Sequence, residues 1–137
     1  MALVCIGILL VSCGSNRPSD PKAQFIRDFG FHIDKKDCVL EELFNSYEGF
    51  PYEGIALYKL TVGEDVRQAF LQWERLPFSE EAEHFLESLS AYVELPSIAD
   101  GCWKMVDRNP GTSAYTNVSL CVYDEATGAA YLLTMDI

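Results

Sequence analysis

Residues 117–137 read NVSLCVYDEATGAAYLLTMDI, and the rest of the fold can be worked out from this stretch. Its first seven residues alternate as a strand does, because successive side chains of a strand point to opposite faces of a sheet. A polar turn follows from Asp124 to Gly128, with the glycine placed for the positive φ that hairpin turns use. The stretch therefore predicts a β-hairpin with strands at 117–123 and 129–137. The alternating side chains are Val118, Leu120 and Val122 on one face and Ser119, Cys121 and Tyr123 on the other.

Three further strands are predicted before this hairpin. Residues 55–62 (IALYKLTV) are rich in β-branched and aromatic side chains, which favour strands. Residues 101–106 (GCWKMV) are predicted as another strand, and context favours a strand over residues 38–47. With the hairpin, this makes a sheet of about five strands.

Two amphipathic helices are predicted between the second and third strands. Apolar residues spaced at i, i+3, i+4 and i+7 indicate a helix over residues 64–74. The same spacing follows Ser79, a suitable N-cap residue, with two glutamates in the first turn. A shorter helix over residues 23–29 is expected to end at Gly30. The order of elements predicts an α+β fold, an antiparallel sheet with the two amphipathic helices packed on one face.

Composition and charge exclude two classes of protein. Hydrophobic residues make up 49% of the 137 residues, which is too many for a disordered chain. The formal net charge is −11, from 10 basic and 21 acidic residues, so the chain lacks the basic surface that binds nucleic acid. The mean hydropathy is nevertheless close to zero, and the excess of apolar residues lies at the N-terminus.

Residues 3–11 form an apolar run of nine residues, too short for the ~20 residues that span a bilayer but typical of an export signal. The run ends in Leu10-Val11-Ser12-Cys13, which resembles the lipobox of bacterial lipoproteins. That resemblance implies attachment of diacylglycerol to the Cys13 sulfur, cleavage before Cys13 and acylation of the new N-terminus. Two or three acyl chains anchor a protein stably to a membrane. The expected partner is therefore membrane lipid, and the expected location is the extracytoplasmic face of the cell membrane.

These signals divide the chain into three parts. Residues 1–12 are predicted to be a lipoprotein signal peptide, residues 13–22 a flexible tether, and residues 23–137 a single α+β domain. The alternative is that the apolar run is a buried N-terminal strand or helix and that its cysteine is incidental. Three cysteines remain in the domain, so at most one disulfide is expected, and no spacing predicts structural zinc. They are Cys38, Cys102 and Cys121.

A second resemblance rests on motifs of the domain. The pattern Leu95-Pro-x-Ile98-x-x-Gly101-x-Trp103-x-x-x-Asp107-Arg108 is followed by Asn117-Val-Ser-Leu-Cys-Val-Tyr-Asp124 and by Thr127 and Tyr131. Together with residues 73–77 and 30–34, these motifs resemble a family of small, mostly uncharacterised lipoproteins and hypothetical proteins of Firmicutes. The resemblance runs from about Phe25 to the C-terminus. It implies no activity, because the motifs are turns, strand starts and a hairpin.

Two histidines could take part in catalysis or metal binding. His84 has Glu80 and Glu87 at helical spacing, and His32 lies two residues from Asp34. The preferred explanation is a solvated polar face for the first group and polar groups at a turn or strand end for the second. No nucleophile elbow, phosphate-binding loop or metal motif is present. We therefore expect no catalytic residues, no metal and no cofactor.

The best candidate for a binding surface is the aromatic loop of residues 47–52. Tyr47, Phe50 and Tyr52 could present rigid contact area to a protein or peptide, and Arg108 could bind an anion. Alternatively, the loop aromatics fold back onto the core, and Arg108 fixes its own loop through an ion pair.

The leading hypothesis is a membrane-anchored, extracytoplasmic binding or interaction module whose partner is another protein or a peptide. One alternative is a small cell-surface hydrolase that uses His32 or His84. The other is an acidic, immunity-type inhibitor that covers a basic toxin by charge complementarity.

Overall fold

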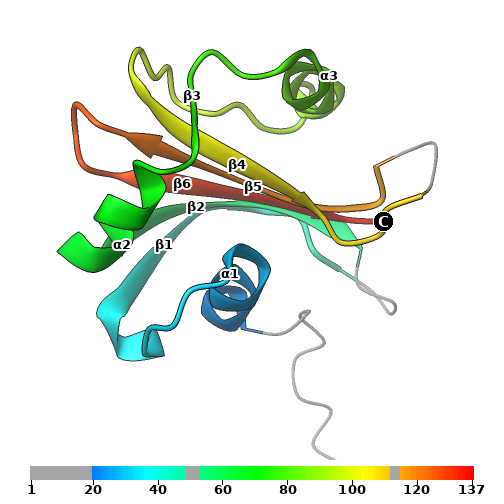
Figure 1. Cartoon of the computed structure of the whole chain (residues 1–137). Helices are drawn as coiled ribbons and strands as arrows, with labels where there is room; N and C mark the ends of the chain where they lie inside the picture. Colours follow the sequence, from blue (N-terminus) through cyan, green and yellow to red (C-terminus); the bar gives the residue numbers. More distant parts are fainter. Residues whose placement is uncertain (1–19, 49–52, 112–114) are drawn as a thin grey trace, which may run out of the picture.

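The computed structural model describes residues 20–48, 53–111 and 115–137 (Figure 1). Six strands form one antiparallel sheet in the order β1-β2-β6-β5-β4-β3, and three α-helices lie against it. The predicted α+β class is confirmed. The strands are β1 (Cys38–Asn45), β2 (Gly54–Val62), β3 (Glu74–Arg75), β4 (Gly101–Asp107), β5 (Asn117–Asp124) and β6 (Ala130–Asp136). The helices are α1 (Pro21–Phe29), α2 (Glu64–Phe70) and α3 (Glu80–Leu89), with a 3-10 turn, η1, at Lys35–Asp37.

The predicted C-terminal hairpin is confirmed. Strands β5 and β6 pair from Asn117 opposite Asp136 to Tyr123 opposite Ala130. Gly128 has a φ of 72°, and its N–H donates to the Asp124 carbonyl at 2.8 Å. The turn is therefore closed by the glycine that the sequence pointed to.

Both faces of the sheet are buried. Every residue of β5 after Asn117 is buried, whichever way its side chain points. One cluster, the α1-side cluster, contains Cys121 and Tyr123 of β5, and the other, the α3-side cluster, contains Val118, Leu120 and Val122. The alternation predicted for β5 thus serves two cores rather than one core and one solvated face.

The two amphipathic helices lie on opposite faces of the sheet, whereas the sequence predicted one face for both. Helix α2 contributes Val66 and Phe70 to the α1-side cluster, and α3 contributes Ala82, Phe85 and Leu89 to the α3-side cluster. The chain passes along the sheet edge as β3 between these helices (Figure 1). The physical reason is the apolar character of both faces of β5, because each face needs its own cover.

Helix α1 covers the sheet on the same side as α2, and aromatic rings join the two helices. Six rings lie with centroids 4.7 to 6.5 Å apart in successive pairs. The helix begins two residues earlier than expected, because Asp20 caps it by accepting from the Lys22 N–H at 3.0 Å and Pro21 suits the first turn. The rings belong to Phe25, Phe29, Phe31, Phe70, Trp73 and Tyr123.

Candidate functional site

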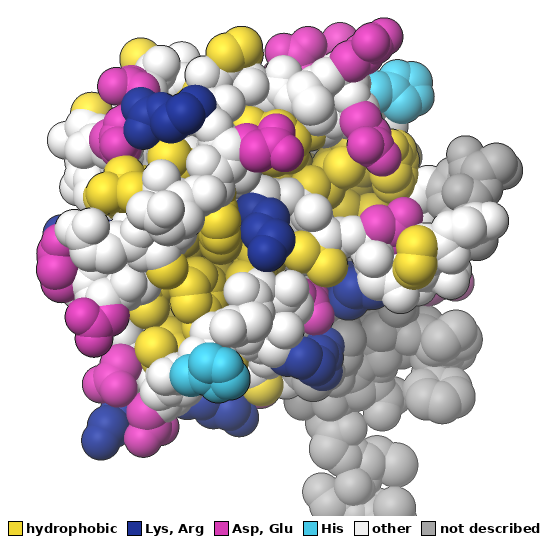
Figure 2. All heavy atoms as spheres, in the orientation of Figure 1, with side chains coloured by type: hydrophobic (Ala, Val, Ile, Leu, Met, Phe, Trp, Pro, Cys, Tyr) yellow, Lys and Arg dark blue, Asp and Glu magenta, His cyan; other side chains and the backbone are white. Residues whose placement is uncertain are grey.

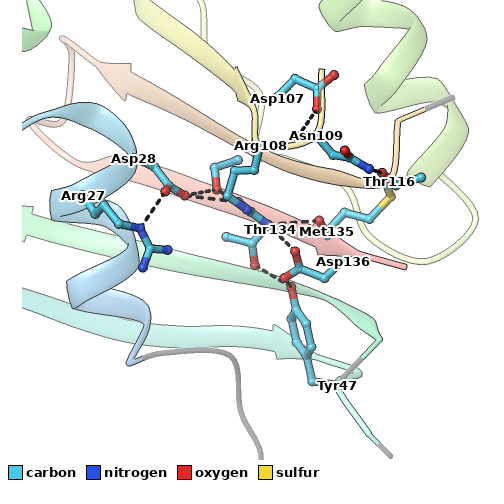
Figure 3. Close-up of polar contacts among 11 residues, drawn as sticks. Arg27, Asp28, Tyr47, Asp107, Arg108, Asn109, Thr116, Thr134, Met135 and Asp136 are labelled. Atoms are coloured by element: carbon cyan, nitrogen blue, oxygen red, sulfur yellow. Dashed lines mark hydrogen bonds and ion pairs between the residues drawn. The ribbon is translucent and has the colours of Figure 1, made fainter. Parts of the chain in front are cut away.

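Two of the predicted binding residues come together in the structure. Tyr47 follows β1, Arg108 follows β4, and both contact Asp136 at the end of β6 (Figure 3). Phe50 and Tyr52, and the predicted lipidation site Cys13, lie outside the described residues.

Arg108 is the centre of a polar network between α1 and the sheet. Its Nη1 lies 3.2 Å from Asp28 Oδ2 and also donates to the Ser119 hydroxyl. Its Nη2 contacts Asp136 Oδ1 and donates to the Met135 carbonyl at 3.3 Å. The Arg108 side chain is only 16% exposed and that of Asp28 only 5%. These contacts occupy the guanidinium, so the geometry favours the alternative in which Arg108 fixes its own surroundings through ion pairs.

Tyr47 completes the network from the opposite side. Its hydroxyl donates to Asp136 Oδ2 at 2.7 Å and lies 3.3 Å from Thr134 Oγ1. Burial raises the pKa of Tyr47 well above its usual value, and the neighbouring Asp136 carboxylate raises it further. The phenol therefore stays neutral, and its hydroxyl is directed into the protein.

The two histidines lie on the surface of the described part of the chain. Both His32 and His84 are exposed, and no hydrogen bond between described residues links either of them to a carboxylate. His32 borders a shallow hollow at the end of α1, with Ile26, Phe31 and Lys35 among its other borders. No group of three metal-binding side chains occurs within residues 20–48, 53–111 and 115–137.

The three cysteines of the domain are free and buried. Burial raises the pKa of the Cys38 thiol and raises that of Cys121 strongly. Cys38 and Cys121 belong to the α1-side cluster, where a neutral thiol packs as a small apolar side chain.

Sequence reasoning missed the open outer edge of β4. Strand β3 pairs only Glu74 with Trp103 and Arg75 with Cys102, so it covers the start of β4 alone. The Arg108 N–H donates to Asn117 of β5, whereas the Gly101 carbonyl accepts from Leu76 on the opposite side. Because main-chain groups of alternate residues point to alternate sides, the N–H and C=O groups of Met105 and Asp107 point away from β5.

Beyond β3, the described residues provide no main-chain partner for Met105 or Asp107. Figure 2 views the molecule from the side of β4 and shows apolar side chains gathered around this edge of the sheet, with acidic side chains towards α3. Among the described residues, the outer edge of β4 therefore has unpaired main-chain groups beside apolar surface.

A pocket of about 530 Å³ lies at this edge. Trp103 is 5% exposed, and its indole Nε1 is buried without a hydrogen-bond partner among the described residues. A buried donor without an acceptor is costly. The pocket is bordered by Gln72, Trp73, Glu74, Ser79, Glu81, Trp103, Lys104 and Met105.

A sequence signal for this edge existed but was weak. The segment Trp73-Glu-Arg-Leu-Pro77 stands between two helices and is too short for a full strand. Its pairing with β4 is long-range, so only the structure shows that β3 ends after two residues.

Comparisons with known proteins give no relative. No family model, no curated protein and no solved structure matches the chain. Among the residues that the structure describes, no helix is long and apolar enough to cross a membrane.

The Arg108 network predicts a large loss of stability in the Arg108→Met variant. We expect the free energy of unfolding to fall by about 3–5 kcal/mol, because Asp28 and Asp136 would remain buried without their cation. Chemical denaturation measures the loss. The control is Arg75→Met, which removes an arginine that also contacts two carboxylates but is half exposed. Equal, small losses in both variants would contradict a structural role for Arg108.

The raised pKa of Tyr47 predicts a loss of stability in alkali. Above about pH 10 the unfolded chain releases the phenol proton while the folded chain retains it, so the free energy of unfolding falls as the pH rises. The slope of the free energy of unfolding against pH reports how many protons unfolding releases. In Tyr47→Phe this number should be smaller by about one, as measured by denaturation curves from about pH 9 to about pH 11. The control Tyr92→Phe, at an exposed position, should leave the slope unchanged. An unchanged slope in Tyr47→Phe would show that the phenol titrates normally.

Proposed function

We propose that this protein is a lipid-anchored binding module that takes up an extended segment of another protein along the outer edge of β4. The observation that carries the proposal is the edge at Met105 and Asp107, which is open among the described residues and lies beside the pocket that Trp103 borders. An extended segment that adds a strand to a sheet gains affinity from main-chain hydrogen bonds and specificity from side-chain pockets. This edge offers both.

The other edge of the sheet is less suited to strand addition. Strand β1 is bulged between Glu42 and Phe44, which interrupts its regular register. It also carries two adjacent glutamates, Glu41 and Glu42, and charges and bulges are common protections of edge strands. We therefore assign the binding role to β4.

The anchor is supported by the sequence alone. The apolar run at residues 3–11 and the lipobox-like Leu10-Val11-Ser12-Cys13 favour lipidation at Cys13. Helix α1 is capped at Asp20, and seven residues span at most roughly 25 Å. A lipid on Cys13 would thus hold the domain close to the membrane surface, where an extracytoplasmic protein or peptide can reach β4.

Replacement of the lipidated residue tests the anchor. In Cys13→Ser, the sulfur that would carry diacylglycerol is missing, so we expect the protein to leave the membrane fraction and to lose incorporation of labelled fatty acid. Ser12→Ala, which keeps a small residue before the cysteine, is the control and should stay in the membrane fraction. Membrane retention and unchanged fatty-acid labelling in Cys13→Ser would contradict lipidation.

A proline at Met105 tests the binding edge. A library of random nonapeptides displayed on phage is selected against the full chain, and the selected peptides are measured by fluorescence anisotropy. Met105→Pro removes the outward N–H without removing a bond to β5, so we expect binding to weaken about tenfold or more. Met105→Val keeps the N–H and is the control.

A second measurement uses the unmodified protein, so that the test does not depend on correct folding of the proline variant. Peptides N-methylated at alternate positions should bind in one methylation pattern and fail in the other, because only alternate residues of an added strand face β4. A library that yields no peptide, or peptides indifferent to both changes, would contradict strand addition at β4.

A further inference from the structure

We propose that the segment bound at β4 carries a lysine or arginine opposite Met105, whose side chain enters the pocket and pairs with Glu81. This inference rests on the proposed function and names the class of partner, a basic extended segment with an apolar residue next to the cation.

The alternation of the strand places this cation. Paired residues of neighbouring strands project to the same face of the sheet. Met105 is two residues after Trp103 in β4, so both side chains point to the same face of the sheet. Trp103 belongs to the α3-side cluster, and a residue opposite Met105 therefore projects towards α3. Glu81 and Ser79 border the pocket on that side.

The start of α3 is negative. Its first turn contains three glutamates, against a helix dipole that amounts to only about half a positive charge at the N-terminus. Ser79 already caps the helix by accepting from the Ala82 N–H at 3.2 Å. Glu74, opposite Trp103 in β3, adds a further carboxylate to the border of the pocket. The three glutamates are Glu80, Glu81 and Glu83.

Glu81 is held in position. The Tyr115 hydroxyl donates to Glu81 Oε1 at 2.6 Å, and this bond to the carboxylate raises the pKa of Tyr115 to about 12. The Tyr115 ring in turn packs edge-on against Phe85 of α3, with centroids 5.7 Å apart. A carboxylate accepts several hydrogen bonds, so Glu81 can receive a cation while it keeps its bond to Tyr115.

The aromatic borders of the pocket suit the same side chain. Trp103, which borders the pocket, packs edge-on against Phe78 on the α3 side of the sheet, with centroids 5.5 Å apart. Lysine and arginine pack their methylene groups on such rings and are attracted to the ring faces.

Lys104 also borders the pocket, but its side chain leaves β4 on the opposite face from Met105. Like Cys102, two residues before it, it points to the face of the sheet on which Val106 and Trp73 pack against the α1-side cluster. Segment residues before and after the cation project to that face. The residue opposite Val106 faces apolar surface and the residue opposite Lys104 faces its exposed side chain, so an apolar residue is expected on the Val106 side of the cation.

The test uses the tightest peptide from the nonapeptide library and its variants with lysine, glutamine or glutamate at the position opposite Met105. For the full chain, we expect the lysine peptide to bind about tenfold more tightly than the glutamine peptide, and the glutamate peptide to bind most weakly. The preference for lysine should shrink at high salt. In Glu81→Gln the lysine and glutamine peptides should bind almost equally.

Two control variants separate the charge of Glu81 from other effects. Glu87→Gln makes the same change of net charge near the far end of α3, and Tyr115→Phe removes the bond to Glu81 but keeps its carboxylate. Both should retain a preference for lysine. Lysine and glutamine peptides that bind the full chain equally, yet still depend on the Met105 N–H, would overturn this inference and leave the proposed function standing. Peptides that bind without that N–H would overturn both.

Discussion

The structure depends on a sheet that is buried on both faces. Strand β5 is buried along both of its sides from Val118 to Asp124, with α1 and α2 on one face and α3 on the other. Burial at about 25 cal/mol per Å² of apolar surface makes this double cover the main source of stability. A partner therefore cannot reach the faces of the central strands, and strand addition is restricted to the two edges. Of these, β1 is bulged and acidic, whereas β4 is covered for only two residues.

The Arg108 network links α1 to the sheet by ion pairs and hydrogen bonds, in addition to the apolar contacts of this helix. Asp28 joins α1 to the network, Ser119 joins β5 and Asp136 joins β6. One guanidinium serves two buried carboxylates, so the loss of the cation is more costly than the loss of either single contact. This arrangement explains why two residues that the sequence marked as a possible binding surface, Tyr47 and Arg108, face each other across Asp136 inside the protein.

The sequence predicts what is local and periodic, and it fails where distant residues meet. The alternation in residues 117–123 and the glycine at 128 predict the hairpin, because strand period and turn chemistry are local properties. The apolar stripes of α2 and α3 look alike, and no local feature tells which face each helix covers. That outcome depends on the path of the chain along the sheet edge at β3, which is set by pairing with β4.

The same limit applies to the sites. The partners of Arg108 lie 80 residues before it and 28 residues after it, so no local pattern could reveal them. The edge of β4 became visible only when the length of β3 was known. Glu81 and Tyr115, which are 34 residues apart, meet only because α3 packs across β4 and β5.

Amide hydrogen exchange at β4, residue by residue, tests whether the outer edge of this strand is open and takes up an added strand. We expect the Met105 and Asp107 amides to exchange fast in the free full chain, whereas those of Lys104 and Val106, which face β5, are protected. Addition of a peptide selected from the library should slow exchange at Met105 and Asp107 and leave Lys104 and Val106 unchanged. Protection of Met105 and Asp107 in the free chain, or no slowing when the peptide is bound, would contradict an open edge that takes up a strand.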